Sequence, residues 1–196
     1  KKSGDLSCTD KITHHGYERF YSDFLNTKNI KNDILEIGYG DGESIKFWNY
    51  IFPNSFLNII DRDKEEKGEN YQVYKCDQSS TIDLNLITKL LKEKRIELIV
   101  DDGSHIPDHQ ILTFNILFDA ILAPGFLYII EDIESSYWKR GRLYGYETKY
   151  GINSEKNLIN SFRYILHWIN REFSLDSEKS ALKREQSLAK KRSQKN

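Results

Sequence analysis

Short apolar runs of β-forming residues alternate along this chain with segments of helical periodicity, and this alternation constrains the fold more than any other feature. The expected strands cover residues 34–37, 56–60, 71–74, 97–100 and 126–130. The helices expected from the spacing of apolar residues cover residues 43–52, 82–94, 108–122 and 157–173. Strands that alternate with helices form βαβ units, because parallel neighbours need a long crossover between them. The pattern therefore predicts an α/β fold with a mostly parallel central sheet flanked by helices.

Two of these helices are expected to be amphipathic. The helix over residues 82–94 is predicted to bury Leu84, Leu86, Ile87, Leu90 and Leu91. The helix over residues 157–173 is predicted to carry one apolar face made of Leu158, Phe162, Ile165, Leu166 and Ile169. An apolar stripe of this kind faces the core in most surface helices.

The remaining segments define the domain organisation. Residues 13–26 are predicted to form an amphipathic helix at the start of a single domain that covers residues 1–175. Residues 134–153 are rich in Tyr, Gly and Arg without periodicity, which predicts a long loop. Residues 176–196 are predicted to be a basic C-terminal helix extension or tail, because they offer few apolar side chains to bury.

Composition and charge exclude several classes of protein. A net charge of −1 predicts no overall attraction to nucleic acid or to an anionic membrane. Two cysteines far apart in the chain, Cys8 and Cys76, make no disulfide framework and suit a reducing compartment. We recognise no signal peptide and no apolar run long enough to span a membrane, so a cytoplasmic location is expected. The sequence contains no Met, even at position 1, which leaves open that a segment precedes it.

Acidic residues follow two of the expected strands directly. The segment DDGSH at residues 101–105 comes after the run 97–100, and the pair Glu131-Asp132 comes after the run 126–130. Ligands of open α/β sheets bind beyond the carboxyl ends of the strands, so one rim is expected to receive a His and up to four carboxylates. Carboxylate oxygens suit a hard divalent cation, and His titrates near neutrality. The rim is therefore expected to hold a metal ion with a base beside it.

A glycine-rich turn, GYGDG at residues 38–42, joins the first strand to the next helix. Glycines let the backbone approach a ligand closely, and the helix N-terminus offers free N–H groups. A dinucleotide-binding turn would need a third glycine where Glu43 stands. Asp61, at the end of the second strand, is suited to binding ribose hydroxyls. Unless the turn is only a tight connection, this combination favours an adenosyl ligand that lacks phosphates.

Several of these segments resemble the motifs of one enzyme family. Residues 35–42 are similar to motif I of class I S-adenosylmethionine-dependent methyltransferases. Further segments narrow the resemblance to the metal-dependent macrolide-sugar O-methyltransferases of the mycinamicin and macrocin group. These segments are Thr9-Asp10-Lys11 with His15 and Tyr17, Asp77-Gln78-Ser79, residues 101–105, and Ile130-Glu131-Asp132 with Ser136-Tyr137-Trp138. The similarity spans about residues 9–173 and implies a Rossmann-like class I methyltransferase fold.

The resemblance implies S-adenosyl-L-methionine as the cofactor and indicates which residues would bind it. The expected cofactor-binding residues are Thr9, Lys11, Glu36, Gly38, Gly40, Asp61, Asp77, Gln78 and Asp101. Gly38 and Gly40 would line the methionine side, Asp61 would bind the ribose, and Asp77 with Gln78 would border the adenine. The two N-terminal residues of this set would help to close the pocket.

The resemblance also assigns Mg²⁺ to Asp102, Glu131 and Asp132. From the residues alone, Asp101 and Asp102 cannot be told apart as ligands. Coordination would lower the pKa of a sugar hydroxyl, as it does for bound water. His105 would then accept the proton as the general base. The expected reaction is Mg²⁺-assisted methyl transfer to a hydroxyl of a sugar or a glycosylated small molecule.

Alternatives remain at both the residue and the function level. Tyr137 and Trp138 are expected either to wall the sugar site or simply to pack, and Tyr144, Tyr146 and Tyr150 either to form an acceptor lid or a plain loop. A non-catalytic nucleotide- or nucleic-acid-binding module is the alternative that the basic C-terminus supports, although nucleic acid is not the expected partner. A catechol-type O-methyltransferase is also open, because Mg²⁺ chelates any vicinal diol. No membrane partner is expected, and a homo-oligomer is left open.

Overall fold

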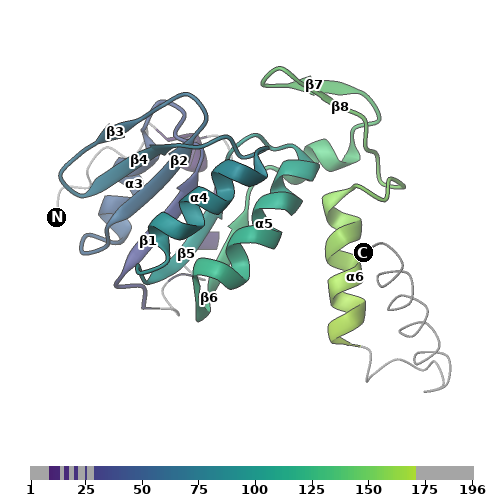
Figure 1. The fold of residues 1–196 in the computed structure, drawn as a ribbon. Coiled ribbons are helices and arrows are strands. Elements are labelled where there is room, and N and C mark those ends of the chain that lie inside the picture. Colours follow the sequence, from purple (N-terminus) through teal and green to yellow (C-terminus); the bar gives the residue numbers. More distant parts are fainter. Residues whose placement is uncertain (1–8, 14–15, 18–19, 22–24, 26–28, 171–196) are drawn as a thin grey trace.

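A computed structural model describes residues 9–13, 16–17, 20–21, 25 and 29–170 (Figure 1). Within them, a six-stranded sheet runs in the order β3-β4-β2-β1-β5-β6. Its strands are β1 (Asp33–Ile37), β2 (Leu57–Asp61), β3 (Glu66–Lys67), β4 (Tyr71–Lys75), β5 (Ile96–Asp101) and β6 (Leu122–Ile130). Every neighbouring pair is parallel except β3 and β4. The predicted mostly parallel sheet is confirmed.

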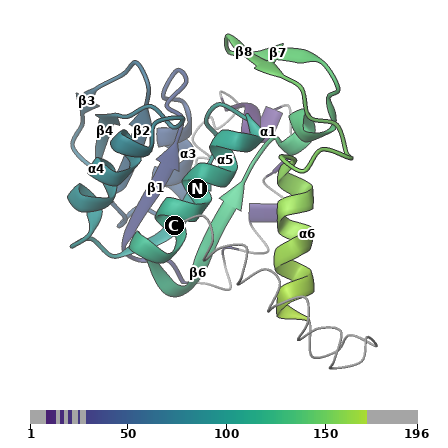
Figure 2. The same ribbon diagram turned by 45° about the vertical axis from the view of Figure 1, so that its right-hand side comes forward.

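Helices cover both faces of this sheet, as the alternating pattern predicts. They are α1 (Asp10–Thr13), α3 (Ser44–Ile51), α4 (Thr81–Leu91), α5 (Pro107–Ile121), the 3-10 helix η1 (Ile133–Tyr137) and α6 (Leu158–Ile169). Helices α4 and α5 lie side by side on one face, and α3 lies on the other (Figure 1). Helix α6 stands beyond β6 and contacts α5 and η1 (Figure 2).

The strands separate two apolar layers because successive side chains point to opposite faces. On β5, Leu98 and Val100 join Trp48 of α3 in one layer. Ile99 joins Leu84 of α4 in the other, and all five side chains are at most 1% exposed. Burial of each such aliphatic side chain contributes about 1.5–3 kcal/mol. The central strands therefore have little freedom to shift, and their carboxyl ends form a rigid rim.

The start of β6 corrects one prediction. Pro124-Gly125 is expected to separate the helix over 108–122 from the strand over 126–130, but β6 begins at Leu122, directly after α5. The strand lies at the sheet edge, where a Pro removes no necessary ladder hydrogen bond. The register between β5 and β6 shifts at this point. The breaking residues therefore interrupt the pairing without ending the strand.

The prediction of a long loop over residues 134–153 is also wrong. This segment contains part of η1 and a two-stranded hairpin of β7 (Gly141–Leu143) and β8 (Tyr146–Thr148). Each hairpin strand has only three residues, too few for a period of two to be visible. The hairpin stands clear of the main sheet at its carboxyl rim (Figures 1 and 2).

The predicted apolar faces of two helices are only partly buried. On α4, Leu86 and Leu90 are 54% and 62% exposed, because the helix turns only its Leu84, Ile87 and Leu91 stripe towards the sheet. On α6, the exposed apolar residues are Ile165, Leu166 and Ile169, whereas Leu158 is buried. Helix α6 stands beyond the edge strand β6, past the sheet rather than on one of its faces (Figure 2).

Two further predictions lie wholly or largely outside the described residues. Of the predicted helix over 13–26, the structure describes only separate residues and the short α1, which ends at Thr13. The predicted C-terminal extension, residues 176–196, is not described. Within the described part of the chain, no helix combines the length and apolarity that crossing a bilayer would require.

Candidate active site

A cleft of about 480 Å³ opens at the carboxyl rim of the sheet. It is lined by residues that follow β1, β2, β4 and β5, together with α1 and the β7–β8 hairpin. Of the predicted site residues, Thr9, Lys11, Glu36, Gly38, Gly40, Asp61, Asp77, Gln78, Asp102 and His105 line it. The parallel strands bring most of these residues together because their carboxyl ends meet at one edge, and Thr9 and Lys11 join them from the start of the chain.

The glycine turn after β1 lies against the DDGSH loop after β5. Gly38 has φ +97°, and a Cβ atom built on it would lie 2.3 Å from the backbone oxygen of Asp102. Any L side chain would therefore force the two loops apart. Gly40 has φ +53°, and a Cβ built there meets no atom of the described residues within 4 Å. The first glycine thus allows close packing, and the second leaves the cleft wall open.

Asp61 ends β2 and lies at the side of the cleft. One carboxylate oxygen accepts the backbone N–H of Tyr39 at 3.1 Å. The other accepts those of Asp63 at 2.8 Å and Lys64 at 3.0 Å. These bonds fix the carboxylate between the β2 loop and the glycine turn. The contact of Asp61 to a ribose stays a prediction.

Asp77 and Gln78, which follow β4, differ in what their side chains can do. Asp77 accepts the backbone N–H and the hydroxyl of Ser79. Burial alone would raise the pKa of Asp77, but these hydrogen bonds lower it, so the carboxyl stays ionised beside the cleft. Gln78 donates to Asp101 at 2.7 Å and accepts the backbone N–H of Ser104 at 2.9 Å. Its amide therefore holds the DDGSH loop in place.

Asp101 does not line the cleft, unlike the other expected cofactor-binding residues. The alternation along β5 turns it to the α4–α5 face, where it is fully buried and bonded to Gln78. Burial raises the pKa of Asp101 to about 7. Asp102, the next residue, points into the cleft instead. The structure thus separates two acids that the sequence alone could not tell apart.

Lys11 is the centre of a buried ionic cluster. Its side chain is 1% exposed, and its ammonium contacts Asp102 and lies 2.7 Å from Glu131 and 3.6 Å from Glu36. Burial of an ammonium costs several kcal/mol unless opposite charges surround it. Burial by itself would lower the pKa of Lys11, but the three carboxylates raise it, so the amine is charged.

Glu131 and Glu36 are the buried partners of this ammonium. Burial raises the pKa of both carboxyls, and the nearby Lys11 opposes that rise. Glu131 also accepts the hydroxyl of Tyr21, and Glu36 accepts the hydroxyl of Ser44 at 2.6 Å. Neither Tyr21 nor Ser44 is among the residues expected from sequence. The side chain of Glu131 is thus engaged with Lys11 and Tyr21, behind the rim.

A second cluster stands in front of it, at the rim itself. Ligand atoms of Asp102, His105 and Asp132 all lie within 4.8 Å of one another, a spacing that could hold a metal ion. Nε2 of His105 is 3.9 Å from a carboxylate oxygen of Asp102 and 3.8 Å from one of Asp132. Of the three predicted metal ligands, the structure brings Asp102 and Asp132 together, with His105 in the position expected of Glu131.

The backbone at this cluster is strained. His105 has φ +54° and Asp132 has φ +48°, in the left-handed region that non-glycine residues rarely occupy. Such residues cost on the order of 1–3 kcal/mol each and persist where the surroundings hold them. Tyr17 donates to Asp132 at 2.7 Å, and Ser135 donates to the backbone oxygen of His105. These contacts fix the carboxylate of Asp132 and the backbone of His105.

Some expected wall residues lie elsewhere. Tyr137 and Trp138 are absent from the described lining of the cleft, and Tyr137 is 54% exposed, so the structure supports neither alternative for Tyr137. Tyr144 and Tyr146, from the hairpin, do line it. Arg62, directly after Asp61, lines it as well and is a residue that sequence reasoning missed. Nothing in the sequence links Arg62 to the hairpin, because the contact forms only in the folded chain.

The strand order, the glycine turn and the acidic rim together define a Rossmann-like class I methyltransferase fold. The solved structure of the methyltransferase MycE from the mycinamycin biosynthetic pathway, in complex with Mg, SAH and mycinamycin VI, is similar, with a TM-score of 0.72. The two chains are 23% identical, and the match covers 90% of this chain and 48% of that one.

The chain is also similar in sequence to sugar O-methyltransferases. It is 27% identical to 8-demethyl-8-alpha-L-rhamnosyl tetracenomycin-C 2'-O-methyltransferase of Streptomyces olivaceus, over 80% of this chain and 43% of that protein. It is 31% identical to mycinamicin VI 2''-O-methyltransferase of Micromonospora griseorubida, over 62% of this chain and 31% of that protein. No protein-family model matches. The resemblance drawn from the motifs is confirmed, and the matched region is less than half of each relative's length.

Proposed function

We propose that this chain transfers the methyl group of S-adenosyl-L-methionine to a hydroxyl of a sugar or glycosylated small molecule, with the assistance of Mg²⁺. The observation that carries the proposal is the cluster of Asp102, His105 and Asp132 at the rim of the cleft. The relatives' names support the choice of a sugar-containing acceptor, because they are O-methyltransferases of rhamnosyl tetracenomycin and of mycinamicin.

The charge of the cleft fits a cationic cofactor and a metal ion. Among the described side chains, the carboxylates of Glu36, Asp102 and Glu131 surround the ammonium of Lys11. A fourth carboxylate, that of Asp132, lies at the rim beside Asp102 and His105. Such an excess of negative charge attracts cations. A sulfonium on the glycine-turn side and a divalent ion at the rim would both reduce it.

The donor set at the rim fits Mg²⁺. Carboxylate oxygens are the protein ligands that Mg²⁺ prefers, and it commonly takes only one or two of them. Asp102 and Asp132 would hold it, while Lys11 and Tyr17 fix the orientation of these carboxylates. When bound, the ion would lower the pKa of an acceptor hydroxyl. Glu131, which the family resemblance would add as a third ligand, faces Lys11 in this structure.

The chain's own residues would supply the rest of the chemistry. Nε2 of His105 faces the rim and would accept the proton from the acceptor hydroxyl. The hydroxyl oxygen would then form its bond to the methyl carbon as the bond from that carbon to sulfur breaks. Gly38 and Asp61 would hold the donor so that the two reactants meet in line, and such positioning supplies a large part of the acceleration.

The test is formation of S-adenosylhomocysteine from S-adenosylmethionine with 8-demethyl-8-α-L-rhamnosyl tetracenomycin C, mycinamicin VI and a simple catechol as separate acceptors. We expect turnover of a glycoside that EDTA abolishes. His105→Ala should lower it by about 100-fold or more. His167→Ala, at an exposed position on α6, should leave it unchanged. Turnover that is insensitive to EDTA, or a fully active His105→Ala variant, would contradict the mechanism. Preference for the catechol would favour the catechol-type alternative.

Three further points remain proposals. We propose one methyltransferase domain over residues 1–175 and a cytoplasmic location, the latter from the sparse cysteines. The rival function, a non-catalytic nucleic-acid-binding module, depends on the basic residues 176–196, which the structure does not describe. The strained rim favours an enzyme over a binding module. It places His105 between the carboxylates of Asp102 and Asp132, an arrangement that serves proton transfer and that binding alone does not require.

A further inference from the structure

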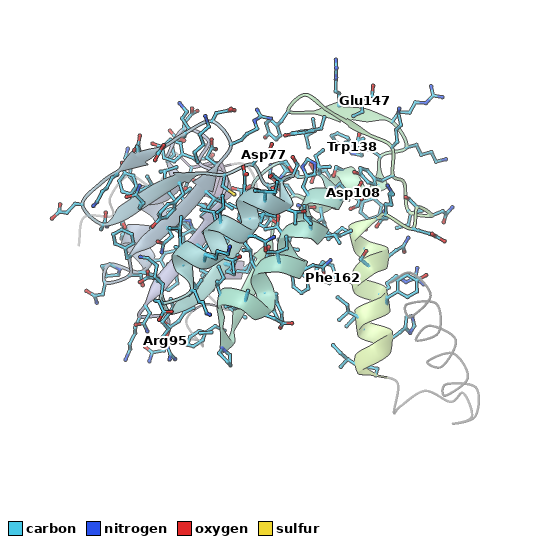
Figure 3. All side chains as sticks on the ribbon, viewed as in Figure 1. Asp77, Arg95, Asp108, Trp138, Glu147 and Phe162 are labelled. Carbon is cyan, nitrogen blue, oxygen red and sulfur yellow. The ribbon has the colours of Figure 1, made fainter. Side chains whose placement is uncertain are left out.

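The inner face of the β7–β8 hairpin is turned towards the cleft. Along β8, Tyr146 lines the cleft and Thr148 is buried, whereas Glu147 between them is exposed and paired with Lys149 at 2.7 Å. This is the alternation expected of a strand with one face on the protein. Glu147 lies on the hairpin, on the side of Trp138 that is turned away from Asp108 (Figure 3). The hairpin therefore forms a roof over the cleft.

Tyr146 connects this roof to the β2 side of the cleft through Arg62. The guanidinium of Arg62 donates to the Tyr146 hydroxyl at 3.0 Å and lies 5.7 Å from the centre of its ring. The same guanidinium makes two hydrogen bonds to Asp63, at 3.0 and 3.1 Å. Its charge is therefore already matched by a carboxylate. This pairing suits a neutral nucleoside better than a phosphate, because a phosphate would bind best to a guanidinium that is not already paired with a carboxylate.

The same ring also contacts the β5 side of the cleft. His109, in the first turn of α5, meets Tyr146 edge to face with ring centres 4.7 Å apart. Nδ1 of His109 is held by the hydroxyl of Ser104 at 2.9 Å. Burial lowers the pKa of His109, so the ring is neutral and packs as an aromatic group. Tyr146 thus bridges the two halves of the rim across the central strand β1.

Arg62 directly follows Asp61, and Arg62 and His109 both lie near enough to Asp77 to help lower its pKa. The bridge therefore lies near the part of the cleft that Asp61 and Asp77 line. We infer that Tyr146 is a cofactor-binding residue that encloses the nucleoside half of S-adenosylmethionine, with Arg62 and His109 as positioning residues that hold its ring. The inference rests on the proposed function. An aromatic ring over a base or a ribose gains contact area with few rotatable bonds to order, so it slows release of the ligand.

The experiment measures binding and release of S-adenosylhomocysteine by stopped-flow fluorescence on the full chain. Tyr146→Ala, which removes the ring, should speed release by about tenfold, the effect expected of one lost aromatic contact. Tyr146→Phe removes only the bond to Arg62 and should speed release by roughly threefold. Glu147→Ala is the matched control in the same strand, and it should stay within about twofold of the parent chain.

The outcomes separate this inference from the proposed function. If the parent chain binds S-adenosylhomocysteine and Tyr146→Ala releases it at the parent rate, Tyr146 does not enclose the ligand and the inference is wrong. If the parent chain itself does not bind, the proposed function fails, and the inference with it. Circular dichroism spectra of each variant check the fold. Should Tyr146→Ala lose its structure, Tyr146→Phe decides, because release at the parent rate would mean that the bond to Arg62 does not hold the ring over the ligand.

Discussion

Replacing Gly38 by Ala should destabilise the fold far more than the same change at a glycine of similar conformation. The added Cβ would lie 2.3 Å from the backbone oxygen of Asp102, and real Cβ contacts essentially never fall below 3.0 Å. The oxygen cannot easily move, because the backbone N–H of Asp102 is bonded to Ile37 at 3.0 Å. The two loops must therefore separate at the base of the cleft.

Three contributions set the cost of Gly38→Ala. A left-handed φ costs an L residue about 1–2 kcal/mol, and the loss of freedom in the unfolded chain returns about 0.4–1 kcal/mol. Overpacking adds about 1–3 kcal/mol, so Gly38→Ala should lose about 2–4 kcal/mol in total. Gly145 has φ +88°, but a Cβ there meets no described atom within 4 Å. Gly145→Ala should therefore lose only the conformational part, about 0–2 kcal/mol.

The assay is urea unfolding of both variants followed by circular dichroism. Gly38→Ala should be less stable than Gly145→Ala by about 2 kcal/mol, and it should also weaken binding of S-adenosylhomocysteine. Equal losses in the two variants would refute the reasoning, because they would mean that the DDGSH loop gives way at no cost.

Three other predictions follow from the described contacts. Lys11→Met should lower the free energy of unfolding in urea by about 3–5 kcal/mol, because it leaves buried carboxylates without a cation. The control Lys94→Met, at a half-buried pair with Asp33, should lower it by at most about 1 kcal/mol. Similar losses in the two variants would contradict the placement of Lys11 at the centre of the cluster. Tyr144→Asn should raise the melting temperature by about 2–4 °C in a thermal scan. Tyr144 has φ +46° in a two-residue turn, where Asn is favoured. A lower melting temperature would contradict the backbone strain at Tyr144. Burial alone would raise the pKa of Glu97, but hydrogen bonds from Lys31, Asn32 and Arg95 lower it, so the ionised carboxyl stabilises the fold above its ordinary pKa and loses that effect as the pH falls below it. Glu97→Gln should therefore cost about 1–3 kcal/mol at pH 7 and clearly less near pH 4, and a cost independent of pH would contradict this sign.

The sheet and its rim were predictable because both depend on local patterns. Buried strands read as continuous apolar runs, and parallel pairing brings whatever follows Ile37, Val100 and Ile130 to one edge. The glycine turn and the DDGSH segment therefore indicated a ligand site before any geometry was known. Side chains alternate between the two faces along β5, so the position of Asp101 on the α4–α5 face follows once the strand is known to extend to Asp101.

The rest of the site depends on contacts between distant segments. The ammonium of Lys11 contacts Glu131, which lies far along the sequence. Arg62 donates to Tyr146 of a hairpin whose sequence shows no periodicity. Three-residue strands are too short for periodicity, and their turn carries Tyr144 where Asn or Gly would be the usual signal. The residues that carry strain or long-range charge pairs are thus the ones that local propensity does not predict.

Isothermal titration of S-adenosylhomocysteine into the chain tests whether the cleft binds the methyl donor, and it needs no knowledge of the acceptor. We expect one binding site per chain, which Asp61→Ala weakens by about tenfold or more through loss of a charged hydrogen-bond acceptor. We also expect Asp132→Ala, at the rim, to leave this binding largely intact. No detectable heat of binding, or equal binding by the Asp61→Ala variant, would contradict the assignment of the cleft to S-adenosylmethionine.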